Sequence, residues 1–283
     1  PVPPMFVSLA GGNAFFIGMA LVTGAFASNY RIIWPWQGAI AKLAALGGAI
    51  LVFLSSTPFS ESARAIWSVL FLAAMAESFF PEPSRCRSGL LGALATLSAL
   101  LCLFEAPHHF APKIPVDADR PVYVIGDSIS AGVRSQERNW PAVLGDMARL
   151  RVINLAVAGA TTSSALPQLN EIKHPNSLVF VEIGGNDLLR GVSSARFRED
   201  LDVLLSKLCN QRVVMFELPL YPFRSEYGKA QRELARQHGV LLIPKRYMAR
   251  VIGGDGRTID GLHLSQRGHD EFAASIYRLL RIE

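Results

Sequence analysis

Cysteine is scarce in this chain, which contains only Cys86, Cys102 and Cys209 among its 283 residues. Their spacing fits neither a zinc site nor a CxxC redox pair, and three thiols are too few for a disulfide framework. We therefore interpret all three cysteines as structural or incidental.

Charge is sparse in the first part of the chain. Residues 1–110 contain only nine charged side chains, whereas the remainder has the composition of an ordinary globular domain. The net charge of +5 is mild, and no long basic run or basic–aromatic interleaving is present. These features argue against a nucleic-acid partner.

The same region is rich in long apolar segments. Crossing a bilayer takes about 20 apolar residues, with a lower limit near 17. Trp34 and Trp36 flank a predicted boundary, as interfacial aromatics do. Small residues such as Gly47 and Gly48 suit close helix–helix contacts in lipid. We predict about four transmembrane helices within residues 1–106, at Phe6–Ala27, Ala39–Leu54, Ala65–Phe80 and Gly89–Phe104.

Two alternatives remain open for these segments. They could form a buried helical domain of a soluble protein, although four such segments leave little polar surface to face water. The first could also be a signal peptide, although no basic residue precedes it.

Loop charges predict an orientation in the membrane. Arg31 and Lys42 bracket the first connection, Arg85 and Arg87 occupy the third, and the second carries only Arg64. Positively charged loops stay in the cytoplasm, so the fourth helix would run outward. We therefore predict an integral protein of a bacterial inner membrane whose later residues lie on the periplasmic or extracytoplasmic side.

The rest of the chain divides into a linker and a second domain. Residues 107–120 are proline-rich and predict a short, stiff linker. Residues 121–283 alternate strand and helix signals, which indicates an α/β domain with a parallel sheet covered on both faces. The predicted strands are Val122–Ile125, Val152–Leu155, Leu178–Ile183, Arg212–Phe216 and Val240–Ile243. The predicted helices are Trp140–Arg149, Ala195–Cys209, Glu226–His238 and Gln266–Leu280.

Candidate catalytic residues lie in loops of this domain. Ser128 follows the first predicted strand, Gly159 the second and Asn186 the third, while Asp260 and His263 precede the last helix. In open α/β sheets, ligands bind at the carboxyl ends of the strands. Taken alone, the Gly-Asp-Ser sequence is equally well explained as a strand-to-helix turn.

Acyl transfer requires this combination of residue types. A serine hydroxyl needs a histidine to take its proton, and a carboxylate must orient the imidazole. Fixed N–H donors must stabilise the negative oxygen of the tetrahedral intermediate.

The four blocks Gly-Asp-Ser at 126–128, Gly159, Gly-Gly-Asn-Asp at 184–187 and Asp-Gly-Leu-His at 260–263 resemble those of the SGNH/GDSL hydrolase superfamily. The phrases around Gly159 and Asn186 are similar to the esterase/thioesterase/lysophospholipase I branch. The resemblance covers about residues 120–283. It implies a flavodoxin-like three-layer sandwich with a five-stranded parallel sheet, and neither metal nor cofactor.

Carried over by residue, the resemblance implies Ser128 as nucleophile, His263 as general base and Asp260 as its orienting acid. The oxyanion hole would comprise the backbone N–H groups of Ser128 and Gly159 and the side chain of Asn186.

Four apolar residues follow strand ends and are candidates to contact an acyl chain, although ordinary packing explains them equally well: Leu188, Leu189, Tyr221 and Phe223. Asp127 and Asp187 adjoin catalytic positions, and we expect them to cap or brace loops.

The leading hypothesis is a membrane-anchored serine esterase that hydrolyses carboxylic esters or thioesters of a small molecule, a lipid or an acylated glycan. An O-acyltransferase or deacetylase acting on envelope polysaccharide or lipid would use the same residues. A non-catalytic, membrane-tethered binding module is the third alternative.

Overall fold

The computed structural model describes residues 4–28, 35–80 and 86–282. Two compact units are present, an α/β unit formed mainly by residues 110–220 and 226–283 and a helical unit formed by residues 8–109 with 221–225. Each unit is described below by itself.

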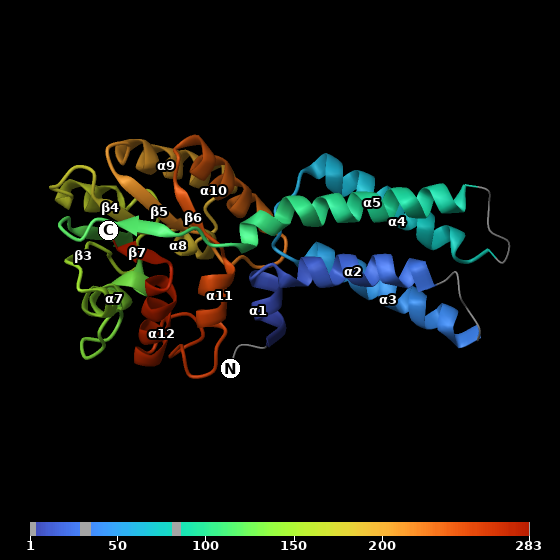
Figure 1. Ribbon diagram of the computed structural model, residues 1–283, viewed down its shortest axis with the longest axis horizontal. Helices are drawn as coiled ribbons and strands as arrows, with labels where there is room; N and C mark the ends of the chain where they lie inside the picture. Colours follow the sequence, from blue (N-terminus) through green and yellow to red (C-terminus); the bar gives the residue numbers. More distant parts are fainter. Residues whose placement is uncertain (1–3, 29–34, 81–85, 283) are drawn as a thin grey trace. The chain divides into compact units, whose positions relative to one another are not determined.

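A five-stranded parallel sheet forms the centre of the α/β unit (Figure 1). The strand order is β3-β2-β4-β5-β6. The chain enters the sheet at β2, adds β3 on one side, and then adds β4, β5 and β6 on the other side. This reversal of direction lies between β2 and β4, and α/β proteins bind ligands at the carboxyl ends of the strands at such a switch point. The strands are β2 (Val122–Gly126), β3 (Val152–Asn154), β4 (Leu178–Glu182), β5 (Arg212–Phe216) and β6 (Leu241–Ile243).

Alternating side chains build a core on each face of the sheet. Val122 and Val124 of β2 join one cluster, and Tyr123 and Ile125 join the other. This division follows because successive side chains of a strand point to opposite faces. Helices α7, α11 and α12 contribute to the first cluster, and α9 and α10 to the second, giving three layers (Figure 1).

The helices of this unit occupy the connections between strands. Asn139, Ser193 and Ser265 cap α7, α9 and α12, each accepting a backbone N–H of the first turn. Helix α11 and the short elements α6, α8 and η3 were not predicted. The helices are α6 (Ser128–Ala131), α7 (Trp140–Ala148), η3 (Leu166–Glu171), α8 (Gly185–Leu189), α9 (Ser194–Lys207), α10 (Ser225–Gln237), α11 (Arg246–Ile252) and α12 (Gln266–Tyr277).

A second, two-stranded sheet was also not predicted. Strand β1 (Ile114–Val116) pairs in parallel with β7 (Leu280–Ile282). The expectation of an irregular linker over residues 107–120 was incomplete, since this segment contains the 3-10 helix η2 (Ala106–His109) at its start and then β1. Ile114 and Val116 are fully buried in the core cluster that includes α12.

Five helices form the first part of the chain: α1 (Pro4–Ala10), α2 (Asn13–Ser28), α3 (Pro35–Leu54), α4 (Glu61–Glu77) and α5 (Arg87–Glu105). The prediction of one continuous segment over Phe6–Ala27 was wrong, because α1 ends before Gly11 and α2 begins after Gly12. Gly12 has φ +86°, a left-handed conformation that ends a helix and favours glycine. Arg31, Trp34 and Arg85 lie outside the described residues.

Helices α2 and α3 meet through two glycines. A Cβ added to Gly18 would lie 2.5 Å from the Gly48 carbonyl oxygen, and one added to Gly48 would lie 2.7 Å from that of Gly18. A side chain at either position would therefore force the backbones apart. Between α4 and α5, the buried Trp67 indole donates a 2.9 Å hydrogen bond to Ser98 Oγ.

Among the described residues, two helical stretches are long and apolar enough to cross a membrane, Gln37–Leu54 and Arg87–His109. Asn13–Ser28 is apolar but shorter. This finding is weaker than the prediction of four spans, because α2 and α4 are only 16 and 17 residues long.

Candidate active site

Ser128 lies at the turn between β2 and the short helix α6 and is 9% exposed. The preceding Gly126 is clamped by Gln168, whose Oε1 accepts the Gly126 N–H and whose Nε2 donates to the Gly126 carbonyl, both at 3.0 Å. A Cβ on Gly126 would lie 2.8 Å from both the Glu182 carbonyl oxygen and Ser130 Oγ. Only glycine therefore fits without displacing β4 or α6.

Two buried carboxyl groups lie beside this turn. Glu182 is opposite Gly126 in the sheet register, and the charge of Asp127 acts on its carboxyl group. Ser130 Oγ donates a 2.9 Å hydrogen bond to Glu182 Oε2 and accepts one of 3.1 Å from the Trp140 indole. Asp127 also caps α6, because its Oδ1 accepts the Ile129 N–H. The turn is thus fixed from several directions.

The two carboxyl groups have shifted pKa values. Burial raises the pKa of Asp127 to about 6, although hydrogen bonds and the nearby charge of His263 lower it. Burial and the Asp127 charge raise the pKa of Glu182 well above its usual value. Two adjacent carboxylates cannot both ionise cheaply, so ionisation of Asp127 disfavours ionisation of Glu182.

Two backbone N–H groups are available at the same edge of the sheet. Within the part of the chain that the structure describes, the N–H groups of Ser128 and Gly159 donate no hydrogen bond. Gly159 has φ +77°, and its carbonyl oxygen accepts a 2.8 Å hydrogen bond from Arg190 Nη2. Arg190 follows α8. Its hydrogen bond fixes the orientation of the peptide group between Gly159 and Ala160.

Asn186 lies on α8 and joins three loops. Its Nδ2 donates to Asp127 Oδ2 and to the Ala160 carbonyl, each at 3.1 Å. The structure therefore brings Asn186 beside both the serine turn and the Gly159 loop. In this arrangement both N–H bonds of the carboxamide already have protein acceptors.

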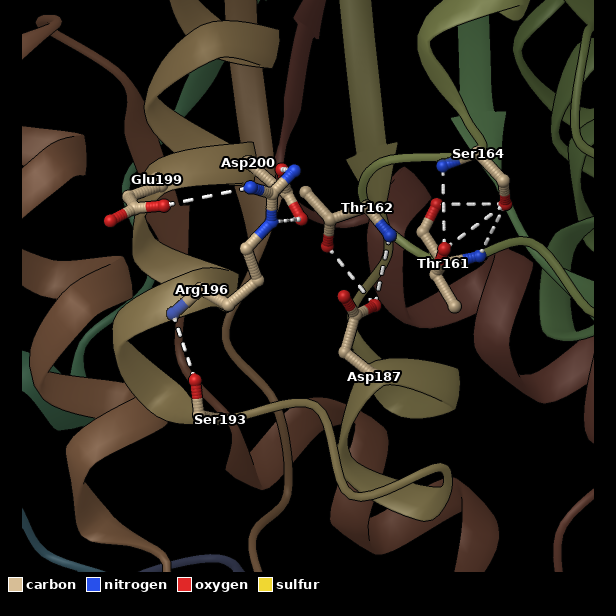
Figure 2. A network of polar contacts seen from close by, with 8 residues as sticks. All are labelled: Thr161, Thr162, Ser164, Asp187, Ser193, Arg196, Glu199 and Asp200. Atoms are coloured by element: carbon tan, nitrogen blue, oxygen red, sulfur yellow. Dashed lines mark hydrogen bonds and ion pairs between the residues drawn. The ribbon is translucent and has the colours of Figure 1, made fainter.

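The neighbouring Asp187 braces the Gly159 loop (Figure 2). Its Oδ2 accepts the Thr162 N–H at 2.9 Å and Thr162 Oγ1 at 3.1 Å, while Oδ1 is buried without a hydrogen bond. Burial raises the pKa of Asp187. The expectation that Asp127 and Asp187 act as caps and loop braces agrees with these contacts.

Asp260 and His263 form a hydrogen-bonded pair in the loop before α12. His263 Nδ1 lies 2.6 Å from Asp260 Oδ2, and Asp260 Oδ1 accepts the His263 N–H at 2.8 Å. These hydrogen bonds lower the pKa of Asp260 to about 2, so its carboxylate is an acceptor at neutral pH. The proton of a neutral His263 therefore resides on Nδ1, which leaves Nε2 as a free base.

His263 also acts on the serine turn electrostatically, since its charge lowers the pKa of Asp127, the residue before Ser128. Among the described residues, no hydrogen bond joins Ser128 Oγ to His263. The arrangement thus brings a hydroxyl, an oriented imidazole and two unpaired N–H donors to one edge of the sheet. This combination suits acyl transfer.

The four candidate acyl-contacting residues differ in exposure. Leu188 packs against the core, whereas Leu189 is 55% exposed. Tyr221 and Phe223 are 48% and 72% exposed and belong to the segment that groups with the helical unit.

The positioning roles of three residues were not predicted from the sequence. Gln168, Glu182 and Arg190 act through contacts across loops and strands. Glu182 carried the clearest signal, because a charged residue inside the fully buried strand Leu178–Glu182 needs a partner.

Comparison with known proteins identifies the class. The profile of the GDSL-like Lipase/Acylhydrolase family matches residues 124–271. The chain is 30% identical to an arylesterase of Vibrio mimicus over 52% of its own length and 80% of the relative. It is 32% identical to thioesterase 1/protease 1/lysophospholipase L1 of Escherichia coli K12, covering 43% of this chain and 64% of that protein. The crystal structure of TesA superposes with a TM-score of 0.50 at 26% identity, covering 56% of this chain and 97% of that structure.

The chain belongs to the GDSL-like lipase/acylhydrolase family, as the resemblance of its four blocks indicated. It is a serine hydrolase that acts on ester bonds. The alternative of a non-catalytic binding module is therefore set aside.

Proposed function

We propose that Ser128 is the nucleophile, His263 the general base and Asp260 its orienting acid in hydrolysis of carboxylic esters or thioesters. The observation that carries this assignment is the 2.6 Å pair of His263 Nδ1 and Asp260 Oδ2, which exposes Nε2 as a base near the serine turn. The N–H groups of Ser128 and Gly159 and the Asn186 carboxamide complete the site as an oxyanion hole.

The reaction proceeds in two half-reactions. His263 Nε2 removes the Ser128 hydroxyl proton as Oγ attacks the acyl carbon, and it passes that proton to the departing alcohol or thiol. A water molecule, deprotonated by the same nitrogen, then attacks the acyl-Ser128 ester and releases the carboxylic acid. Asp260 remains ionised throughout and stabilises the imidazolium.

Asn186 must exchange a partner to take part. Both of its N–H bonds are engaged, one by Asp127 and one by the Ala160 carbonyl. We propose that the Asp127 contact persists as an anchor and that the bond to Ala160 is shared with the substrate oxyanion. One such donor contributes about 3 kcal/mol to lowering the barrier.

The acyl chain is proposed to contact Leu189, the more exposed of the two leucines on α8. Leu188, Tyr221 and Phe223 remain candidates for the same role. A panel of aryl esters, thioesters and lysophospholipids, from acetyl to palmitoyl, would define the preferred substrate. These three substrate classes are the ones that the names of the similar proteins mention.

Replacement of the nucleophile tests the assignment. Ser128→Ala is expected to abolish hydrolysis of p-nitrophenyl esters and labelling by a fluorophosphonate probe. Ser206→Ala, at an exposed position on α9, is the matched control and should retain both. Turnover by Ser128→Ala at the wild-type rate would refute the proposed role.

We further propose that residues 1–106 anchor the enzyme in a membrane through about four helices, with 107–120 as linker and 121–283 as hydrolase domain on the periplasmic or extracytoplasmic side. The outer surface of the helical unit supports this, because large apolar side chains face outward along its helices. Examples are Ile40, Leu43, Ile66, Val69, Leu72 and Leu103, which are 55%, 68%, 56%, 65%, 63% and 68% exposed.

Localisation and topology can be measured together. The full chain should stay with membranes after alkaline extraction, and a reporter joined to its carboxyl end should be active only outside the cytoplasm. A reporter active only in the cytoplasm would reverse the proposed orientation.

Anchoring near lipids and nascent glycans also favours a second candidate reaction, O-acyl transfer to or deacetylation of envelope polysaccharide or lipid. A sugar hydroxyl would then replace water in the second half-reaction. Mass spectrometry of products formed with a glycan acceptor present would distinguish transfer from hydrolysis.

A further inference from the structure

A cavity of about 300 Å³ lies between helices α11 and α12 of the α/β unit. Its polar wall contains four arginines and a single carboxylate, Glu271. The volume is at the lower end of those that hold small ligands. The side chains that line the cavity therefore carry a net positive charge.

Helix periodicity aims these arginines at the same space. Arg246 and Arg250 are four residues apart on α11 and share one face. Arg278 follows the last turn of α12, seven residues after Glu271 and on its face. Arg257 lies in the loop between the two helices.

Glu271 does not neutralise the group. Its two oxygens pair with Arg257 Nε at 2.5 Å and with Arg267 Nε at 2.9 Å. Among the described residues, Arg246, Arg250 and Arg278 have no ion pair, and the Arg246 Nε atom is buried without a hydrogen bond. Lys113 adds a further positive charge nearby, since its Nζ donates to the Arg278 carbonyl.

Such a cluster favours a bound anion. Arginine cannot relieve the repulsion by losing a proton, because its pKa exceeds about 12. Its planar fork of N–H donors matches the oxygens of a phosphate group and binds them in pairs. The apolar part of the wall, formed by Val251, Ala274 and Leu279, leaves room for a small substituent.

We propose that this cavity binds a phosphate group, held by Arg246, Arg250 and Arg278 with Arg257 at its edge. The group is either free phosphate or the headgroup of an anionic phospholipid. Both sources present the same tetrahedral oxyanion to the arginines.

The site is connected to the loop that carries Asp260 and His263. Arg257 Nη1 donates to the Arg250 carbonyl, and the Arg257 carbonyl accepts the Ser265 N–H, both at 2.9 Å. A phosphate bound by both Arg250 and Arg257 would link α11 to the loop before α12 and so stabilise that loop. Occupancy is therefore expected to raise the thermal midpoint of the enzyme.

The test uses the full chain with inorganic phosphate in 0.15 M salt, measured by calorimetry and by thermal unfolding. Arg246→Gln and Arg278→Gln should each weaken phosphate binding at least about tenfold. Arg236→Gln removes the same charge from an exposed position on α10 and should bind like the wild type. Glu271→Gln removes the only carboxylate of the cavity and should bind more tightly.

A second arm separates the two sources. Titration of the detergent-solubilised full chain with short-chain phosphatidylglycerol, against short-chain phosphatidylcholine, should depend on Arg246 and Arg278 if a lipid headgroup is the ligand. Calorimetric binding of free phosphate without this dependence identifies a soluble ligand. The proposal is overturned if the wild type binds neither, or if both arginine variants bind like Arg236→Gln. Ester hydrolysis by every variant, together with circular dichroism, reports separately on the active site and on folding.

Discussion

At the scale of single residues, the serine turn depends on two buried carboxyl groups. Asp127 and Glu182 are both buried, and each carboxyl group shifts the pKa of the other. Asp127 holds Asn186 and the first turn of α6, while Glu182 accepts a hydrogen bond from Ser130. Charge placement therefore determines the geometry next to the nucleophile.

This pair predicts a pH dependence of stability. Because the pKa of Asp127 rises from 3.8 to about 6 on folding, the folded state binds this proton more tightly than the unfolded state. The contribution is complete below about pH 4 and is lost as pH rises through about 6. Asp127→Asn should therefore lose less thermal stability between pH 4 and pH 7 than the wild type does. Asp119→Asn, at an exposed position, is the control and should follow the wild-type curve.

Asp260 predicts a separation of activity from stability. Asp260→Asn removes the acceptor that fixes the His263 tautomer, so kcat should fall by roughly 10²- to 10⁴-fold. Asp260 is exposed, so the thermal midpoint should change little. Steady-state kinetics with a p-nitrophenyl ester, beside a thermal melt, would measure both. A variant within a few-fold of wild-type kcat would contradict the orienting role.

At the scale of elements, the sheet shows what sequence patterns can predict. The five strands β2 to β6 are apolar runs followed by glycine or polar loops, and each was predicted to within two residues at its ends. Strands β1 and β7 have three residues each and contain Pro115 and Arg281, so they carry no apolar pattern of their own. Their pairing depends on a partner at the far end of the chain, which local reasoning cannot supply.

The site shows a similar limit. The Asp260–His263 pair is local and could be anticipated from a spacing of three residues. The contacts of Glu182 with Asp127 and of Arg190 with Gly159 cross between loops that are distant in sequence. These contacts depend on which strands lie side by side in the sheet, and local sequence patterns do not reveal that order.

The turn before α8 gives a prediction at this scale. Gly184 has φ +112°, and an added Cβ would lie 2.8 Å from Phe197 and 2.9 Å from Leu218. Gly184→Ala should therefore destabilise the α/β unit by about 2 kcal/mol or more, from strain and overpacking together. Gly191→Ala, at φ +70° with nothing within 4 Å of the added Cβ, measures the strain of a positive φ without overpacking. Equal thermal midpoints for the two variants would show that the packing term is absent.

At the scale of the whole molecule, two units follow different packing rules. The α/β unit encloses two apolar cores, one on each side of its sheet. The helical unit buries Trp67, Phe15 and small residues inside and presents large aliphatic side chains outside. Composition indicated a helical first part and an ordinary globular second part, since charge is sparse in residues 1–110. The break at Gly11 and Gly12 was not predicted, because hydropathy does not register a helix end.

The glycine contact between α2 and α3 gives the corresponding prediction. Gly48→Leu should separate these helices and lower the thermal midpoint of the helical signal, because Gly18 leaves no space for a side chain. Gly47→Leu lies one residue earlier with nothing within 4 Å and should be tolerated. Circular dichroism of both variants in detergent would measure the difference.

The pairing of β1 with β7 has a consequence for biosynthesis. Ile114 is made early, but its partner Leu280 leaves the ribosome only after the whole central sheet has been translated. The segment that emerges from α5 must therefore wait, unpaired, while the nascent enzyme acquires its other strands. Pairing of β7 with β1 therefore follows synthesis of the central sheet. A stop codon before residue 280 would leave β1 unpaired and exposed to proteases and to pairing with neighbouring chains.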